Sequence, residues 1–139
     1  MTLVAFGCSS ATGDENSKDS PGQSDSKNTI LPLGASRVEG ARPLFESFRY
    51  ELWMDLRENQ WTFDFVGSQT DPASYPAIHN DSFDRDHDGH SGWTSGEIAD
   101  GLPGWLEQVG APQIVLFSSP GGNDMLQGLP FDDAATNIY

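Results

Sequence analysis

The stretch that decides the fold is Thr29-Ile30-Leu31-Pro32-Leu33, which leads into Gly34-Ala35-Ser36. Its first five residues form an apolar run between a polar segment and a glycine, the pattern of a short buried β-strand. Pro32 cannot donate a hydrogen bond to a sheet, but it stands near the end of the run, where a proline is tolerated. The sequence therefore predicts a buried strand that ends in a loop of small residues carrying Ser36.

Strand and helix patterns alternate after this loop. By residue number, they are a helix over 44–58, a strand over 62–67, a helix capped by Ser95, a strand over 113–117 and a helix starting at Phe131. Gly101 and Pro103 are expected to interrupt or end the second helix, and the continuous apolar run of the last strand predicts cover on both faces. This order predicts an α/β fold, a three-layer α/β/α sandwich with a parallel sheet. Its chemistry should lie beyond the carboxyl ends of the strands, at 34–36 and 121–124.

Composition limits the class of protein. The 139 residues are enough for one domain with a core, and the formal net charge of −14 argues against nucleic acid as a partner because phosphates repel an acidic surface. No apolar run approaches the roughly 18 residues of a membrane-spanning helix. With a single cysteine, the chain cannot form an intrachain disulfide.

That cysteine, Cys8, follows the apolar run 2–7 and precedes a polar stretch rich in Ser, Asp, Asn and Gly. The order is typical of a lipoprotein signal, with a lipidation site at Cys8 and a disordered tether after it. It predicts a signal remnant and tether over 1–28, a folded domain over 29–139, and an extracytoplasmic location, secreted or anchored to the cell envelope. The alternative is a disordered N-terminus with an incidental thiol.

Five blocks in series carry a family resemblance. They are Leu33-Gly34-Ala35-Ser36-Arg37-Val38-Glu39-Gly40, Ser47-Phe48-Arg49-Tyr50-Glu51-Leu52-Trp53, Phe65-Val66-Gly67-Ser68-Gln69, His87-Asp88-Gly89-His90-Ser91-Gly92-Trp93 and Gly121-Gly122-Asn123-Asp124. Residues 29–139 resemble the SGNH (GDSL-type) hydrolases, a superfamily with a flavodoxin-like sandwich. Within it, they are most similar to carbohydrate esterase family three, the acetyl-xylan esterase branch.

The resemblance implies a serine ester hydrolase that needs no cofactor and acts on an acylated carbohydrate or another small ester. Ser36 matches the nucleophile, and Gly92 and Asn123 match two oxyanion donors, the backbone N–H of Ser36 completing the set. Such preset donors stabilise the alkoxide of a tetrahedral intermediate. Without these blocks, Ser36 would be an ordinary loop hydroxyl and Asn123 a turn residue.

Departures from the family pattern limit the expected activity. The family's catalytic pair is an Asp-x-x-His near the C-terminus, and the sequence ends at Tyr139 before such a block. The three histidines, His79, His87 and His90, all precede the Asn123 block and match no family base. Ala35 replaces the family's aspartate, and the Ser118-Ser119-Pro120 link is one residue longer than usual. We therefore expect a C-terminally truncated domain with little or no Ser36-dependent turnover.

Two further features stay open on the sequence alone. Trp93, beside Gly92, could line a sugar site or belong to the core. Asp84, Asp86 and Asp88 alternate before Gly89 as at the start of a calcium loop. Position twelve of such a loop would be Ser95 rather than a glutamate, so the two remaining interpretations are a looser calcium site and a solvated turn. The functional alternative is a noncatalytic, carbohydrate-binding or calcium-holding envelope module on the same fold.

Overall fold

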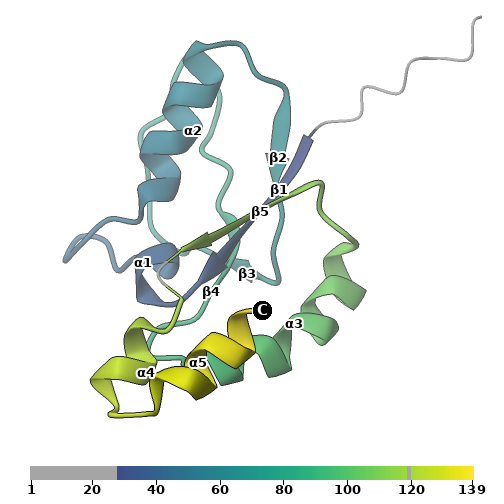
Figure 1. The fold of residues 1–139 in the computed structure, drawn as a ribbon. Helices are drawn as coiled ribbons and strands as arrows, with labels where there is room; N and C mark the ends of the chain where they lie inside the picture. Colours follow the sequence, from purple (N-terminus) through teal and green to yellow (C-terminus); the bar gives the residue numbers. More distant parts are fainter. Residues whose placement is uncertain (1–27, 119) are drawn as a thin grey trace, which may run out of the picture.

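The computed structural model describes residues 28–118 and 120–139 (Figure 1). Its central strand is β1 (Asn28–Gly34), which pairs in parallel with β2 (Phe63–Phe65) along its first residues and with β4 (Asp86–Gly89) at its last two. β5 (Ile114–Ser118) pairs in parallel with β1 along the opposite edge. Among the strands in the described residues, only β3 (Gln69–Thr70), paired with β4, is antiparallel. The parallel sheet predicted from the alternating pattern is confirmed.

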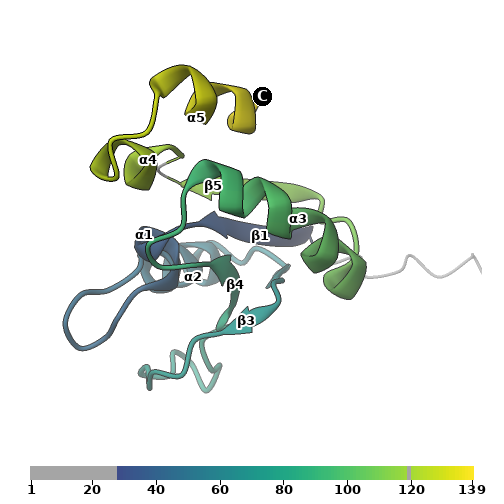
Figure 2. The same ribbon diagram turned by 90° about the horizontal axis from the view of Figure 1, so that it is seen from below.

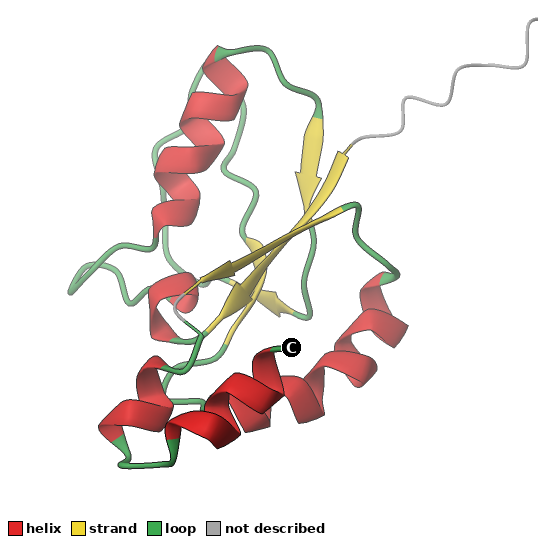
Figure 3. Cartoon of the chain, in the orientation of Figure 1, coloured by secondary structure: helices red, strands yellow, loops and turns green. Residues whose placement is uncertain are grey.

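The described residues also form the helices α1 (Ser36–Glu39), α2 (Phe48–Glu58), α3 (Ser95–Val109), α4 (Gly122–Leu126) and α5 (Phe131–Ile138), which are red in Figure 3. In Figure 1, β1 and β5 run between α1 and α2 on one side and α3 and α5 on the other, and the view from below in Figure 2 has α3 in front of these strands. This is the predicted three-layer sandwich. Among the helices described, none has the length and apolar character needed to cross a membrane.

The core consists of two clusters, one on each face of β1. Ile30 belongs to the cluster under α2, with Tyr50 and Trp53, whereas Leu31 and Leu33 belong to the cluster under α3. Successive side chains of a strand point to opposite faces, so one apolar run serves both layers. The continuous apolar character of residues 29–33 thus has a direct structural cause.

The helix expected over 44–58 begins later, at Phe48. Ser47 is its N-cap, and its hydroxyl accepts a hydrogen bond from the Arg49 backbone N–H at 3.3 Å. Leu44 is 87% exposed and lies in the preceding loop. The predicted start was wrong because the apolar residues 44 and 45 extend the helical spacing without contacting the core, while the serine supplies the cap.

The helix α3 differs from expectation at both ends. Thr94, not Ser95, is the N-cap, and it forms a capping box with Glu97. The helix also continues through Gly101 and Pro103 to Val109, so the expected interruption was wrong. Gly101 has a packing reason, because a Cβ there would lie 2.4 Å from the Trp105 indole, which is buried against the sheet.

Two strands differ from the sequence prediction. β5 forms where expected, but it is not covered on both faces: Ile114 is 41% and Val115 50% exposed. β4 forms inside a segment predicted as a long loop, because its residues Asp86-His87-Asp88-Gly89 carry no apolar alternation that would mark a strand. Cys8 and the tether proposed before residue 28 lie outside the described residues.

Candidate active site

Ser36 is the first residue of α1, directly beyond the carboxyl end of β1, and it is partly exposed. The tight entry into α1 depends on Gly34, whose φ of +153° is unfavourable for other residues. A Cβ at Gly34 would lie 2.7 Å from the Ser118 carbonyl oxygen and 2.8 Å from the Val38 side chain. The glycine therefore lets α1 and the end of β5 approach each other next to Ser36.

The buried side chain of Arg49 supports α1 from behind. Its guanidinium donates to the carbonyl oxygens of Val38 at 2.7 Å and Glu39 at 2.9 Å, the last two residues of α1. It also forms a 2.8 Å ion pair with Asp71. One arginine on α2 thus anchors the helix that carries Ser36.

Asp71 holds this arrangement together on the other side of Arg49. Burial alone would raise the pKa of Asp71, but hydrogen bonds from the Tyr75 hydroxyl at 2.6 Å and the Ala73 N–H at 2.8 Å, with the Arg49 charge, lower it below its usual value. Burial and the Asp71 carboxylate in turn raise the pKa of Tyr75 to about 12. The lowered pKa keeps Asp71 a carboxylate at neutral pH, and the raised pKa keeps Tyr75 protonated.

Asn123 lies on α4, which starts after β5 through Gly121 in a left-handed conformation with φ +78°. Ser36 and Asn123 line one cavity of about 290 Å³, together with Ala35, Arg37, Gly122 and Leu126. The structure therefore brings the two segments beyond β1 and β5 to the same hollow. The Asn123 side-chain amide donates one hydrogen bond to the Trp93 carbonyl oxygen at 2.7 Å. A primary amide has two N–H bonds, so the second remains for another acceptor.

The neighbouring carboxylate, Asp124, fixes the position of α4. It is buried and accepts hydrogen bonds from the Ser95 backbone N–H at 2.8 Å and the Ser95 hydroxyl at 2.7 Å, at the first residue of α3. Burial would raise the pKa of Asp124, but these bonds from Ser95 lower it. Asn123 thus sits on a short helix locked to the start of α3.

Gly92 lies in a turn beside this helix rather than in the cavity lining. The Trp93 N–H donates to the His90 carbonyl oxygen at 3.2 Å, and Gly92 has φ +82°, which together define a type II β-turn. The Gly92 carbonyl oxygen accepts from Gln127 at 3.2 Å, and nothing lies within 4 Å of where its Cβ would be. Gly92 is therefore open to solvent and tied to α4, one residue from the carbonyl that Asn123 binds.

Trp93 is half-buried in an aromatic cluster. Its ring stacks on His90 with centroids 4.5 Å apart and lies 5.7 Å from Trp105, and His90 also stacks on Trp105 at 4.2 Å. Trp93 packs against the core cluster under α3 and is not among the residues that line the Ser36 cavity. Its ring supports the turn that carries Gly92, and a substrate contact stays a prediction.

None of the three histidines lines the Ser36 cavity. His79 is exposed in a distant turn. His87 is buried, and burial, followed by the nearby Arg49 charge, lowers its pKa to about 3, so the ring is neutral and its Nδ1 accepts the Gly89 N–H at 2.9 Å. His90 Nε2 lies 3.7 Å from Asp88 Oδ1 in the aromatic cluster. Each imidazole thus has a structural position away from the nucleophile.

Asp84, Asp86 and Asp88, which the sequence offered as the start of a calcium loop, each accept hydrogen bonds from a different residue. Asp84 accepts from the Phe65 N–H at 2.7 Å, Asp86 from the Thr70 hydroxyl at 2.9 Å, and Asp88 from Ser68, through the hydroxyl at 2.5 Å and the N–H at 3.0 Å. Within 28–118 and 120–139, no group of three or more His, Cys, Asp or Glu side chains is arranged to hold a metal ion. These carboxylates join the segment 84–88 to β2, to β3 and to Ser68 between them.

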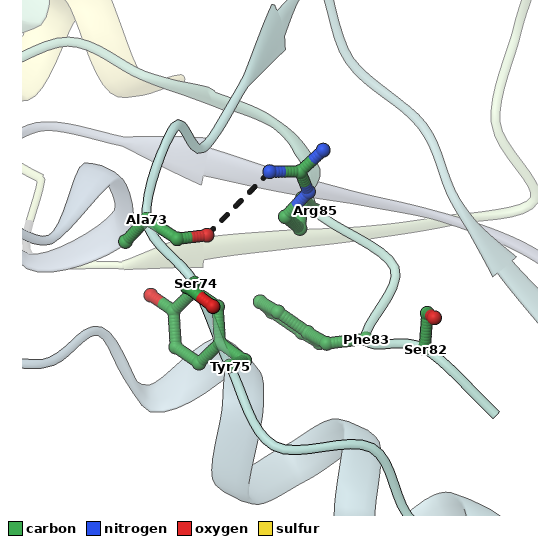
Figure 4. A pocket seen from close by; sticks show the side chains of 6 residues that line it. All are labelled: Ala73, Ser74, Tyr75, Ser82, Phe83 and Arg85. Carbon is green, nitrogen blue, oxygen red and sulfur yellow. Dashed lines mark hydrogen bonds between the residues drawn. The ribbon is translucent and has the colours of Figure 1, made fainter. Parts of the chain in front are cut away.

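A second hollow, of about 230 Å³, lies between the segments 73–75 and 82–85. Figure 4 shows Arg85 bridging its rim, with a 3.5 Å hydrogen bond to the Ala73 carbonyl oxygen, while Tyr75 and Phe83 line it. Phe83 is a core residue of the α2 cluster. This hollow contains none of the residues around Ser36. It lies between two loop segments that pack on the α2 side of the sheet.

Comparison with solved structures shows which proteins this chain is similar to. A family 3 carbohydrate esterase from Clostridium thermocellum matches with 36% identity and a TM-score of 0.63, over 81% of this chain and 53% of that one. An acetyl esterase variant solved with acetate ion matches with 30% identity and a TM-score of 0.63, over 79% and 53%. The chain is thus similar in fold and in sequence to family 3 carbohydrate esterases. It spans about half the length of these solved relatives.

The SGNH esterase AlinE4 shows the same fold, with 21% identity and a TM-score of 0.58 over 81% of this chain and 49% of that one. No family model and no curated protein matches the chain. The resemblance to family 3 carbohydrate esterases within the SGNH hydrolases, expected from the five sequence blocks, is confirmed.

Sequence reasoning missed three residues that shape this candidate site: Glu39, Arg49 and Gln127. Each acts through a side chain that reaches another segment of the backbone, to Ser91, to α1 and to Gly92 respectively. The only sequence signal was an arginine and a glutamate within the quoted blocks, and neither spacing nor charge indicates which carbonyl or amide such a side chain meets.

Proposed function

We propose that this chain supplies the nucleophile and the oxyanion donors of an ester hydrolase that removes acetyl, or another short acyl group, from a polysaccharide or related glycoside. The observation that carries the proposal is the shared cavity of Ser36 and Asn123 at the carboxyl ends of β1 and β5. In open α/β sheets this is the edge where substrates bind. The acetyl esterase and carbohydrate esterase relatives supply the substrate class.

In this mechanism the Ser36 hydroxyl attacks the carbonyl carbon of the ester. The new C–O bond forms as the carbonyl π electrons move to oxygen, and the resulting oxyanion receives the free Asn123 N–H and the backbone N–H groups of Ser36 and Gly92. Collapse breaks the C–O bond to the sugar, whose oxygen takes up the proton that Ser36 gave to its acceptor and leaves as a hydroxyl. Water then cleaves the acyl–Ser36 ester, which releases the free acid and restores the serine hydroxyl. Donors preset for the oxyanion are each worth about 10²–10³ in rate.

The serine proton needs an acceptor. An unassisted hydroxyl is a poor nucleophile near neutral pH, and the described residues place no histidine on the cavity. In the family this acceptor is the histidine of an Asp-x-x-His pair. Turnover therefore requires such a pair to reach Ser36, and we expect residues 1–139 alone to show no Ser36-dependent hydrolysis.

The test is hydrolysis of p-nitrophenyl acetate by the product of the complete reading frame, measured beside Ser36→Ala. We expect kcat/KM of the variant to be lower by a factor of at least about 10³, as for removal of a nucleophile. Ser74→Ala is the matched control, because Ser74 is an exposed serine on the separate hollow of Figure 4. Equal rates for Ser36→Ala and the unaltered protein would reject the hydrolase assignment.

One observation favours a noncatalytic binding module instead. Ala35 occupies the N-cap of α1 where the family has an aspartate, and no side chain caps the helix there. If the module only binds glycan, acetylated xylan should bind the product of the complete reading frame with equal affinity in Ser36→Ala and show no release of acetate. Ser36-dependent acetate release excludes this alternative.

We also propose that Cys8 carries a lipid and holds the domain at the cell envelope. The support is the sequence order alone, an apolar run, a small residue, the cysteine and a polar stretch. Mass spectrometry of membrane-fraction protein should show a lipid-sized increase that Cys8→Ser abolishes. An unmodified Cys8 in that fraction contradicts the proposal.

A further inference from the structure

Glu39 links the nucleophile helix to the turn that carries Gly92. It is the last residue of α1, and its carboxylate oxygen Oε2 accepts a hydrogen bond from the Ser91 backbone N–H at 2.5 Å. This is the direct side-chain bond between the four-residue helix that starts at Ser36 and the turn His90–Trp93. The two proposed donor segments are thereby tied at one point.

The geometry points to Glu39 as a positioning residue for the Gly92 backbone N–H. The inference rests on the proposed function, since it concerns the oxyanion donors of that site. In a type II turn, the peptide between the two central residues, here Ser91 and Gly92, has the opposite orientation to that of a type I turn. A flip of this single peptide would turn the Gly92 N–H away by about half a revolution.

Both ends of the flipping unit are held. Glu39 binds the N–H of Ser91, before the peptide, and Gln127 binds the carbonyl oxygen of Gly92, after it. Gly92 itself offers no resistance to a flip, because a glycine adopts either sign of φ and no atom lies within 4 Å of its absent Cβ. The direction of the donor therefore depends on these two side chains.

Gly89, on which α1 packs, allows the Glu39 side chain to contact Ser91. Gly89, the last residue of β4, pairs with Gly34 in the sheet. A Cβ on Gly89 would lie 2.3 Å from the Glu39 backbone N, so α1 can pack directly on β4 only above a glycine. Since Ser91 follows β4 by two residues, this close packing brings its N–H within reach of the Glu39 carboxylate.

The first test reads the contact directly in the 139-residue chain. Amide hydrogen exchange by NMR should show the Ser91 N–H exchanging at least about tenfold faster in Glu39→Ala, because its acceptor is lost. Glu39→Gln keeps a side-chain oxygen as acceptor and should retain most of the protection. Glu58→Ala, an exposed glutamate at the end of α2, is the matched control. Unchanged Ser91 exchange in Glu39→Ala overturns the inference.

The second test reads the catalytic consequence in the product of the complete reading frame. A misdirected oxyanion donor weakens binding of the transition state and not of the ester, so Glu39→Ala should lower kcat by about 10–100-fold with KM within about twofold. Glu39→Gln should recover most of kcat, a rescue that a general loss of folding would not show. A rise in KM with unchanged kcat overturns the positioning role.

Ser36→Ala separates this inference from the proposed function. If Ser36→Ala abolishes hydrolysis and Glu39→Ala leaves kcat unchanged, only the role of Glu39 is rejected. If hydrolysis does not depend on Ser36, the proposed function fails and the positioning role falls with it, whatever the Ser91 exchange shows.

Discussion

The guanidinium of Arg49 lies 2.8 Å from the carboxylate of Asp71, and the two side chains are 0% and 7% exposed. The same guanidinium donates to the Val38 and Glu39 carbonyl oxygens and to the Arg85 carbonyl oxygen at 3.2 Å. Three separate segments thus converge on one buried charge. The ion pair is a structural support for α1, because without Asp71 the buried guanidinium would keep only neutral hydrogen-bond partners.

We predict that Asp71→Ala lowers the free energy of unfolding by about 3–5 kcal/mol, since it leaves a buried charge without its counter-ion. Urea denaturation followed by tryptophan fluorescence measures the change. Asp81→Ala is the matched control: its partner Arg57 is 38% and Asp81 48% exposed, and exposed pairs contribute under about 1 kcal/mol. Similar losses in both variants would show that the Arg49–Asp71 pair has no special role.

A second prediction concerns acid. The pKa of His87 is about 3 in the folded chain against 6.5 for a free histidine, because burial disfavours the charged ring. Below pH 6.5 the unfolded chain therefore binds a proton that the folded chain does not, and stability falls as the pH drops from 6.5 toward 3. We expect this single group to remove about 3 kcal/mol between pH 6.5 and 4.

His87→Asn isolates that contribution, because an asparagine oxygen can still accept the Gly89 N–H while the side chain no longer titrates. Urea midpoints measured from pH 7 to 4 should fall less steeply in this variant than in the unaltered chain. His79→Asn, at an exposed histidine, should leave the slope unchanged. Parallel slopes in all three proteins would show that His87 is not the group responsible.

How much of the fold the sequence predicts depends on whether the signal is local. Residues 29–33 and 113–117 are apolar runs, and both form strands of the parallel sheet. β4 is polar throughout and becomes a strand only because Gly89 pairs with Gly34 and Asp86 with Thr70. A strand specified by its partners leaves no period in its own residues.

The site divides in the same way. Ser36 and Asn123 were placed from the rule that loops beyond parallel strands meet at one edge, and the structure puts them on one cavity. The contacts of Glu39 with Ser91 and of Arg49 with Val38 follow no such rule. They depend on side-chain reach after the elements have packed, which no spacing along the chain encodes.

A third prediction tests the close packing of α1 on Gly89. Gly89→Ala should lower the free energy of unfolding by about 2–3 kcal/mol, because its Cβ would lie 2.3 Å from the Glu39 nitrogen, an overpacked position. Gly104→Ala is the matched control, since Gly104 lies inside α3 with nothing within 4 Å of a Cβ. That variant should gain about 0.5–1 kcal/mol from helix propensity. Urea denaturation measures both, and a tolerated Gly89→Ala would contradict the close approach of α1 to β4.

The last prediction concerns β5, whose residues Ile114 and Val115 are 41% and 50% exposed. Among the described residues no strand pairs with its outer edge, and an open apolar edge invites pairing between copies of a chain. We expect the 139-residue chain to self-associate in sedimentation velocity as its concentration rises, and Val115→Lys to shift it toward monomer.

The effect of charge alone has the opposite sign. The chain has a net charge of −14, so an added positive charge by itself weakens the repulsion between copies and favours association. Gln108→Lys, on the exposed side of α3, adds the same charge away from β5 and should leave association unchanged or slightly stronger. If both lysine variants associate alike, the exposed strand is not the contact; if only Val115→Lys dissociates, the apolar face of β5 is.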